Sequence, residues 1–226
     1  TVFEGYGDTN ALRVYTVVTN LTEAPLILEE VSALCITGIG DKNDPDNMHF
    51  TNFLQSHHAE CQPRTRDFRE LGLLGGKSDS QQRVSGCNIG SWSTKEQLPM
   101  GILEDRKNGS FLMFQIESNS SWYYEISDLQ DRYYLYLGGP NYPFGGWFKT
   151  LQPGESYQTP FAAIAFGNSV NDVVGNMTMY RRHIAGVSPA DANLPTNTCT
   201  CPGTALRQRI LPSMPAWLQR PVWNTM

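Results

Sequence analysis

The sequence has no long apolar run and no cluster of basic residues. No stretch approaches the roughly 20 apolar residues that a membrane-spanning helix needs. The 17 Lys and Arg residues are outnumbered by 22 Asp and Glu residues, which gives a net charge of -5. Because contacts to phosphates require clustered cations, we expect no nucleic-acid partner, and we expect no membrane partner either.

Metal-binding patterns are missing as well. The chain has five Cys, and the Cys-Thr-Cys spacing of Cys199 and Cys201 matches no standard zinc site and has no pair of His residues nearby. We therefore expect no metal and no cofactor. Unpaired cysteines are the favoured interpretation, and one disulfide between Cys61 and Cys87 is the alternative.

An acidic segment contains Asp41, Asp44 and Asp46 but lacks the Gly and the terminal Glu of a calcium loop. A solvated turn is the favoured interpretation. The neighbouring pair His57 and His58 is expected on a strand, where successive side chains point to opposite faces and cannot share one metal ion.

The chain also lacks an initial Met and a signal peptide. It begins at Thr1, which suits a mature form, a clipped form or a fragment. A length of 226 residues predicts one or two domains and is sufficient for a substantial core.

A series of β-rich, aromatic segments is present instead. They follow one another in a fixed order: Gly90–Asp105 (GSWSTKEQLPMGILED), Phe111–Glu117, Trp122–Asp128, Leu137–Pro140, Trp147–Lys149, Leu151–Glu155 and Tyr180–Ile184. In this order they resemble the N-terminal region of family-36 glycoside hydrolases, the α-galactosidases, of a fungal type. The resemblance covers roughly residues 10–184.

The resemblance implies an all-β fold, a large antiparallel β-sandwich or supersandwich, followed by a helix that leads into a (β/α)8 catalytic barrel. It also implies hydrolysis of terminal α-D-galactosyl residues from oligosaccharides such as raffinose or melibiose. The family's retaining mechanism uses two Asp residues on later barrel strands. No position in residues 1–184 corresponds to them, so no catalytic residue is transferred to this chain.

Periodicity supports this organisation from the residues themselves. Alternation predicts strands at 11–20 and 25–37, joined as a hairpin, with further strands at 50–58 and 157–167. Three more, at 111–117, 122–128 and 132–137, are predicted as one meander with aromatic cross-strand pairs. Segments 72–85 and 138–146 are predicted as loops, and Pro99 and Gly101 as a bend.

The period changes after residue 168. Apolar residues recur at helical spacing from Val170 to Ile184, and Ser169 with Asp172 forms a capping box. We therefore predict a sandwich domain over 1–167, a linking helix over 168–185 and an irregular tail over 186–226.

The family's pattern is lost in that tail. Leu194-Pro195 is followed by Thr-Asn-Thr-Cys-Thr-Cys-Pro instead of an apolar barrel strand. A shifted reading of the codons from Leu211 to Met226 permits an alanine-rich run and then Val-Glu-Tyr-Tyr, which is similar to the start of the family's barrel. A frame-shifted or mis-spliced reading is the favoured interpretation, and a divergent natural tail is the alternative. We expect Trp217 and Trp223 to stay largely exposed.

Two pairs of residues are candidates for binding saccharide: Trp92 with Lys95, and Trp147 with Lys149. Trp offers an aromatic face to a sugar ring, and both pairs lie next to loops with Pro and Gly. A structural corner is the competing interpretation, since a Trp in the core is more common than a sugar platform.

Four Asn-x-Ser/Thr sequons stand at Asn20, Asn108, Asn119 and Asn176. Together they favour a secreted glycoprotein over a cytoplasmic one. Asn108 and Asn119 are expected at the two exposed ends of a strand.

The carboxylates of the chain do not form a catalytic pair in the sequence. The best candidates are Glu96, Glu104, Asp105, Glu125 and Asp128. Neighbours on a strand diverge, whereas retaining hydrolysis needs two carboxyl groups about 5 Å apart. The chain alone is therefore predicted to be inactive. The expected partners are α-galactoside oligosaccharides, through a longer enzyme, and a second copy in a homo-oligomer. A non-catalytic module for carbohydrate binding or subunit assembly is the alternative.

Overall fold

The computed structural model describes residues 1–41, 43–74, 82–129 and 132–186. Residues Thr1–Ala185 form one compact unit. The predicted tail, with its frame shift, its Cys-Thr-Cys motif and its two Trp residues, lies outside the described residues. No described helix is both long and apolar enough to cross a bilayer.

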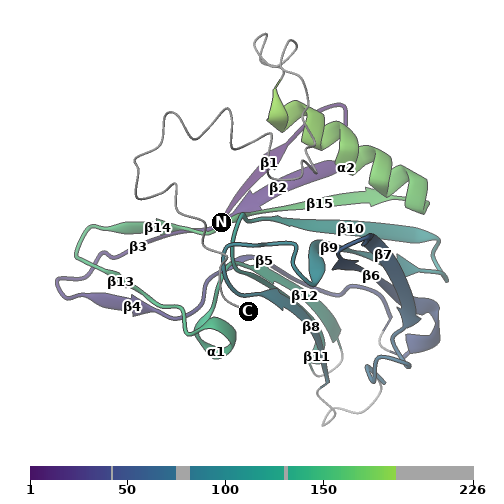
Figure 1. The fold of residues 1–226 in the computed structure, drawn as a ribbon, viewed down its shortest axis with the longest axis horizontal. Helices are drawn as coiled ribbons and strands as arrows, with labels where there is room; N and C mark the ends of the chain where they lie inside the picture. The colour runs from purple at the N-terminus through teal and green to yellow at the C-terminus, as the bar shows by residue number, and fades with distance from the viewer. Residues whose placement is uncertain (42, 75–81, 130–131, 187–226) are drawn as a thin grey trace, which may run out of the picture. The chain divides into compact units, whose positions relative to one another are not determined.

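The unit is a sandwich of two antiparallel sheets (Figure 1). The larger sheet has the strand order β1 (Val2–Gly5), β2 (Ala11–Tyr15), β15 (Phe161–Gly167), β10 (Ser110–Glu117), β9 (Gln97–Asp105), β6 (Met48–Ser56) and β7 (Ala59–Asp67). The smaller sheet has the order β5 (Ser32–Thr37), β12 (Arg132–Gly138), β11 (Trp122–Leu129) and β8 (Arg83–Asn88). The expected all-β antiparallel fold is confirmed.

Large side chains from both sheets fill the space between them. Phe50 and Phe114 of the larger sheet surround Tyr124 of the smaller one, with ring centroids 5.9 and 5.2 Å from it. Trp122 stacks on Tyr124, and all four side chains are buried. Burial of apolar surface is worth about 25 cal/mol per Å², so these aromatic groups supply much of the driving force for folding. Tyr124, one of the aromatic residues of the predicted cross-strand pairs, therefore lies in the core.

Two short strand pairs extend from the sandwich. They are β3 (Val17–Thr19) with β14 (Ser156–Gln158), and β4 (Leu26–Leu28) with β13 (Lys149–Leu151). The prediction of a hairpin between the first two strands was wrong, because β3 and β4 pair with these distant strands instead. The buried Asn20 holds the turn through hydrogen bonds from its Nδ2 to the carbonyls of Ala24 and Leu151.

Helix α2 (Val170–Ala185) lies along the outer face of the larger sheet (Figure 1). Ser169 Oγ accepts a hydrogen bond from the Asp172 amide, as the predicted capping box requires. Val173, Met177 and Tyr180 face the sheet and are fully or almost fully buried. The helix ends within two residues of its predicted end, and its apolar period explains the agreement.

Other local predictions need correction. The predicted meander does not exist, since β10 belongs to the larger sheet and β11 and β12 to the smaller one. Pro99 and Gly101 lie within β9, where the pairing with β6 shifts register between Gly101 and Gln97. Segment 83–85 opens strand β8, and loop 138–146 contains one helical turn, α1 (Tyr142–Gly145). A short 3-10 helix, η1 (Pro45–Asn47), precedes β6.

Strand β7 was missed altogether. Its sequence AECQPRTRD is polar and contains Pro63, so it lacks the apolar alternation by which strands are found. It is the edge of its sheet, where a Pro and charged side chains are tolerated and discourage pairing with another chain.

The two histidines were also misplaced. His57 and His58 form the turn between β6 and β7, where His58 has a φ of 63°, and their ring centroids lie 3.8 Å apart. A turn brings neighbouring side chains together, whereas a strand would separate them. Both remain exposed, as expected.

Candidate functional site

The four residues that were predicted to bind saccharide make different contacts in the structure. Trp92 is 64% exposed, and Lys95 next to it pairs with Glu96 at 3.5 Å. Trp147 packs on Tyr157 with ring centroids 5.2 Å apart, and Lys149 pairs with Glu155 at 2.8 Å. This hydrogen bond from Lys149 lowers the pKa of Glu155.

The segments that carry these pairs meet at one end of the smaller sheet. A narrow crevice there is lined by Ile89, which lies three residues before Trp92, and by Asn141 and Phe144, which precede Trp147. The structure thus brings the two loops into contact, while the candidate side chains engage different partners.

The sequons differ in accessibility. Asn108 and Asn119 are exposed at opposite ends of β10, where they were expected. Asn20 is buried with its Nδ2 bonded to two carbonyls, and the Nδ2 of the half-buried Asn176 donates to the carbonyl of Phe166. Asn108 Nδ2 also donates, to Asp105 Oδ2 at 2.7 Å, but this pair is at the surface. A glycan needs room around the Asn side chain, so the exposure of Asn108 and Asn119 favours these two sequons.

The cysteines that the structure describes are free. Cys61 lies on β7 of the larger sheet and Cys87 on β8 of the smaller one, so the alternative of a disulfide between them was wrong. The acidic segment is paired with cations. Asp41 and Asp44 contact Lys107, and Asp46 contacts Arg69.

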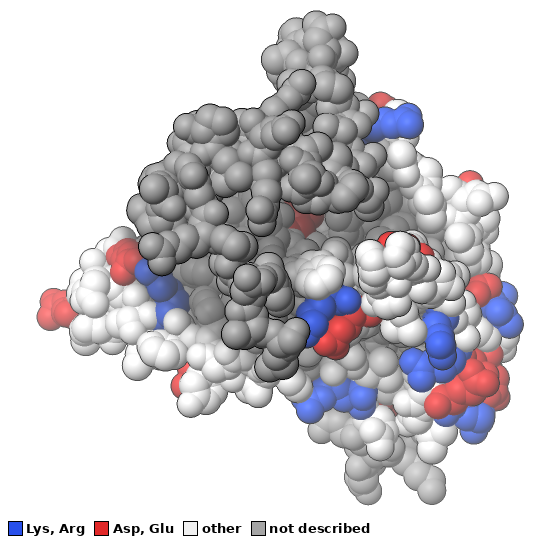
Figure 2. All heavy atoms as spheres, in the orientation of Figure 1, with Lys and Arg blue, Asp and Glu red and all other residues white. Residues whose placement is uncertain are grey.

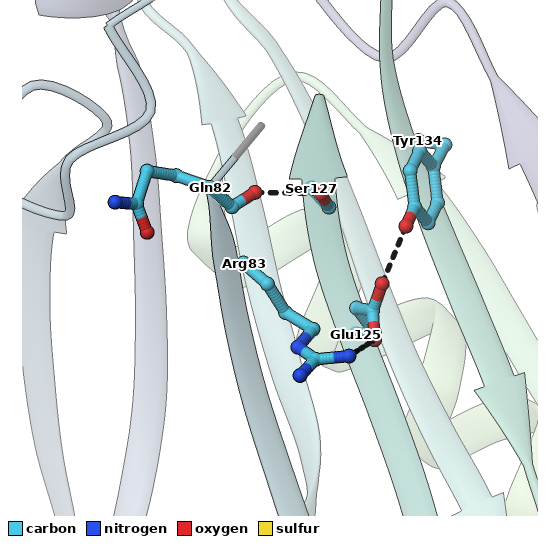
Figure 3. A pocket seen from close by; sticks show the side chains of 5 residues that line it. All are labelled: Gln82, Arg83, Glu125, Ser127 and Tyr134. Carbon is cyan, nitrogen blue, oxygen red and sulfur yellow. Dashed lines mark hydrogen bonds and ion pairs between the residues drawn. The ribbon is translucent and has the colours of Figure 1, made fainter. Parts of the chain in front are cut away.

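A polar hollow of about 480 Å³ lies on the outer face of the smaller sheet, and is the clearest candidate site. It is lined by Gln82, Arg83, Glu125, Ser127 and Tyr134 (Figure 3). Gln82 precedes β8 and Arg83 begins it, Glu125 and Ser127 lie on β11, and Tyr134 lies on β12. The strand register explains this convergence. Arg83 lies opposite Ser127, which lies opposite Tyr134, and Glu125 lies in the next outward row of β11.

Glu125 is the centre of a hydrogen-bond network in this hollow. Tyr134 donates to its Oε1, and Tyr123 donates to its Oε2. Arg83 Nη1 approaches Oε2 at 3.5 Å. Figure 3 shows Arg83 and Tyr134 reaching toward Glu125 from the strands on either side. The two phenols and the guanidinium fix the carboxylate and balance its charge.

Burial keeps the phenols of this face protonated. It raises the pKa of Tyr134 to about 12, with the hydrogen bond to Glu125 as the next cause. Burial, then the bond to Glu125, also raises the pKa of Tyr123. Protonated phenols can only orient Glu125 as donors, while their oxygens remain able to accept.

An aromatic wall closes one side of the network. Phe144 of α1 stacks on Tyr123 with ring centroids 4.7 Å apart, and the Arg83 guanidinium lies 5.4 Å from the Phe144 ring centroid. Asn141 Oδ1 accepts a hydrogen bond from the Phe144 amide and fixes the turn. Arg83 is thereby held between an aromatic ring and a carboxylate.

Among the described residues, Glu125 is the one carboxylate that lines the hollow. Asp128, three residues after Glu125, is buried and its Oδ1 accepts a hydrogen bond from the Gln82 amide. Glu104 and Asp105 lie in the other sheet, on β9. No group of three His, Cys, Asp or Glu side chains suited to a metal ion occurs in the part of the chain that the structure describes.

Sequence reasoning considered Glu125 only as one member of a catalytic pair, and it missed the hollow. Arg83 lies in the segment 72–85 that was predicted as a loop and is in fact on β8. Tyr134 was predicted only as part of the meander with aromatic cross-strand pairs. One signal was available, because polar Glu125 and Ser127 alternate with apolar neighbours in β11 and so predict a polar outer face.

Comparison with known proteins gives a fold and no close relative. No family model matches the chain, and no curated protein matches it. Among solved structures, the α-galactosidase from Lactobacillus brevis matches with a TM-score of 0.63 and 14% identity, over 79% of this chain and 22% of that one. The GH36 α-galactosidase AgaA from Geobacillus stearothermophilus matches with a TM-score of 0.63 and 18% identity, over 79% of this chain and 23% of that one.

AgaB from the same organism matches with a TM-score of 0.61 and 16% identity, over 80% of this chain and 23% of that one. The fold resembles the N-terminal domain of GH36 α-galactosidases. The chain spans less than a quarter of the length of these enzymes. Identities this low show a common fold, and fold alone does not assign an activity.

Proposed function

We propose that this chain is the non-catalytic N-terminal sandwich of a family-36 α-galactosidase. The longer enzyme would hydrolyse terminal α-D-galactosyl residues from oligosaccharides. The observation that carries the proposal is the fold match over 79% of the chain, together with the sequence motifs that resemble the same family in the same order. One of the matching AgaA structures, a variant, is a complex with raffinose.

The fixed position of α2 supports a role as a scaffold. Tyr180 of the helix donates a hydrogen bond to Glu117 of β10, and Arg13 of β2 donates to the other oxygen of Glu117 at 2.8 Å. The guanidinium of Arg13 lies 3.5 Å from the Phe161 ring centroid. A helix held in this way would present the chain that follows it in a defined direction.

Catalysis is assigned to parts beyond the sandwich. Retaining hydrolysis needs two carboxyl groups about 5 Å apart across the glycosidic bond. Glu125 lines the hollow on the outer face of its sheet, whereas Asp128 on the same strand is buried.

The experiment is to sequence the DNA that encodes residues 184–226, restore the frame that continues the barrel, and express the longer product. We expect hydrolysis of a chromogenic α-galactoside by that product. A continuous open frame with no barrel-like sequence, or a longer product without activity, would contradict the proposal.

A module for carbohydrate binding or subunit assembly is the second candidate function. It is favoured by the polar hollow around Glu125 and by the exposed Trp92, while the buried Trp122 and Tyr124 favour a scaffold. Saccharide binding by the isolated chain distinguishes the two.

Secretion of a fungal-type glycoprotein remains part of the proposal. Its support is the exposure of Asn108 and Asn119, and a cytoplasmic location is the alternative. A homo-oligomer is also proposed, and exposed Ile27 and Phe148 near the two short strand pairs are apolar groups that a second copy would cover.

A further inference from the structure

The hollow on the outer face of the smaller sheet has the dimensions and chemistry of a ligand site. Its volume of about 480 Å³ falls within the range of pockets that hold small molecules, roughly 300–1,000 Å³. Its floor consists of the two central strands β11 and β12, so its side chains stand on a rigid support.

Both donors and acceptors remain in the hollow for a ligand. A guanidinium carries five N–H donors, and Arg83 uses one nitrogen to contact Glu125 while its side chain is 55% exposed. A carboxylate accepts about four hydrogen bonds, of which Tyr123, Tyr134 and Arg83 provide three. The phenol oxygen of Tyr134 can accept one more.

The charges of the described residues that line the hollow favour a neutral ligand. The positive charge of Arg83 and the negative charge of Glu125 balance within the same small volume. An anion would meet the carboxylate, and a cation would meet the guanidinium. A neutral ligand with many hydroxyl groups can donate to Glu125 and accept from Arg83 at the same time.

An aromatic surface lies beside these polar groups. Tyr134 is the aromatic residue among the described side chains that line the hollow, and it is half-buried. Phe144 lies beyond Arg83, stacked on Tyr123. The C–H face of a sugar ring is apolar and packs on aromatic rings, while its hydroxyl groups form hydrogen bonds.

We propose that Arg83, Glu125 and Tyr134 form a saccharide-binding site on the outer face of the smaller sheet. The ligand class is a neutral pyranose or a short oligosaccharide of such sugars. Glu125 accepts from one ring hydroxyl, Arg83 donates to others, and the ring packs beside Tyr134. The site belongs to the sandwich itself and does not depend on the α-galactosidase proposal.

The test is titration of the 226-residue chain with D-galactose, D-glucose and raffinose, followed by calorimetry and by saturation-transfer NMR. We expect millimolar affinity, with the strongest NMR transfer to the sugar C–H groups. Loss of one hydrogen bond to a charged partner weakens binding about tenfold or more, so Arg83→Ala and Glu125→Gln should each raise the Kd by at least about tenfold. Because the Arg83 side chain is 55% exposed, we expect Arg83→Ala to test the site while the chain still folds.

Matched controls come from a similar ion pair on the other sheet. Glu104 pairs with Arg106 at 3.2 Å, so Glu104→Gln and Arg106→Ala remove the same groups away from the hollow. Their Kd values should equal that of the parent chain. No saccharide binding, or binding that Arg83→Ala and Glu125→Gln leave unchanged, would overturn the proposal.

Two measurements together distinguish this site from the active site of the longer enzyme: saccharide binding by the isolated chain and α-galactosidase activity of the longer product. Binding by the isolated chain with no α-galactosidase activity in the longer product would support the saccharide site and contradict the proposed function. An active longer product whose sandwich binds no sugar would do the reverse.

Discussion

Tyr180 of helix α2 donates a hydrogen bond to Glu117, and so joins the second half of the helix to the last residue of β10, the central strand of the larger sheet. Both groups are largely removed from water, since Tyr180 is fully buried and the Glu117 side chain is 10% exposed. Arg13 holds the second oxygen of Glu117. This three-residue network and the hydrogen bond from Asn176 to the Phe166 carbonyl are polar contacts between the helix and the sheet.

Tyr180→Phe should destabilise the chain by about 1.5–3 kcal/mol, because it removes a hydrogen bond to a charged acceptor and leaves that acceptor under-satisfied. Urea unfolding followed by circular dichroism measures the change. Tyr142→Phe is the control, since Tyr142 is 52% exposed, and it should change stability by less than about 0.5 kcal/mol. Equal midpoints for the two variants would contradict the role of the network.

The chain should lose stability above pH 10. Burial raises the pKa of Tyr133 and of Tyr134 to about 12, from the ordinary value of 10.0. Between these values the folded state holds protons that the unfolded state has released, so stability is complete below pH 10 and falls as pH rises toward 12. Ionisation of these two phenols, followed by residue-resolved NMR, should therefore appear together with loss of the β-sheet signal. Ionisation of Tyr133 and Tyr134 near pH 10 in a fully folded chain would refute this.

Gly101→Ala should destabilise the chain, and Gly175→Ala should not. A Cβ on Gly101 would meet the Phe50 and Phe114 rings at 2.5 and 2.7 Å, whereas nothing lies within 4 Å of one on Gly175 in α2. Crowding of a packed core costs about 1–3 kcal/mol, while Ala stabilises a helix interior relative to Gly by about 0.5–1 kcal/mol. Thermal unfolding measures whether each variant is more or less stable than the parent chain. A stabilised Gly101→Ala variant would show that β9 is packed differently.

Glycosylation should be restricted to two of the four sequons. In a secretory host, peptide mass spectrometry should find glycan on Asn108 and Asn119, which are exposed. Asn20 should be bare, since its Nδ2 is buried and bonded to two carbonyls. Asn176 should be largely bare because it is half-buried and its Nδ2 is bonded to the backbone carbonyl of Phe166. Full occupancy of Asn20 would mean that the turn after β3 is open during synthesis.

Local signals were sufficient for part of the fold. The helix was predictable because the cap at Ser169 and the apolar period that follows it lie within one segment. Strands β10, β11 and β15 alternate clearly or carry apolar runs. The pairing of β3 with β14 was not predictable, since it joins residues about 140 positions apart and each strand has only three residues.

The site was harder to predict than the fold. Glu125 was noticed, but its role depends on the register that places Arg83 across from Ser127 and Tyr134. Arg83 lies in a Gly- and Ser-rich segment, and this composition predicts a loop. Cross-strand neighbours are set by tertiary structure, and single-sequence periodicity carries no information about them.

Figure 2 shows one face of the molecule, on whose described part Lys and Arg side chains are interspersed with Asp and Glu. Many of these charges form pairs, such as Arg69 with Asp46 and Lys107 with Asp41. Exposed pairs of this kind contribute little to stability.

The central claim is that the sandwich supports an α-galactosidase without being its catalytic part. The most direct measurement compares kcat/KM for a chromogenic α-galactoside between the purified 226-residue chain and the longer product with the restored frame, at equal concentration. The account predicts no turnover by the chain and clear turnover by the longer product. Turnover by the chain that is abolished by Glu104→Gln, Asp105→Asn or Glu125→Gln would contradict it.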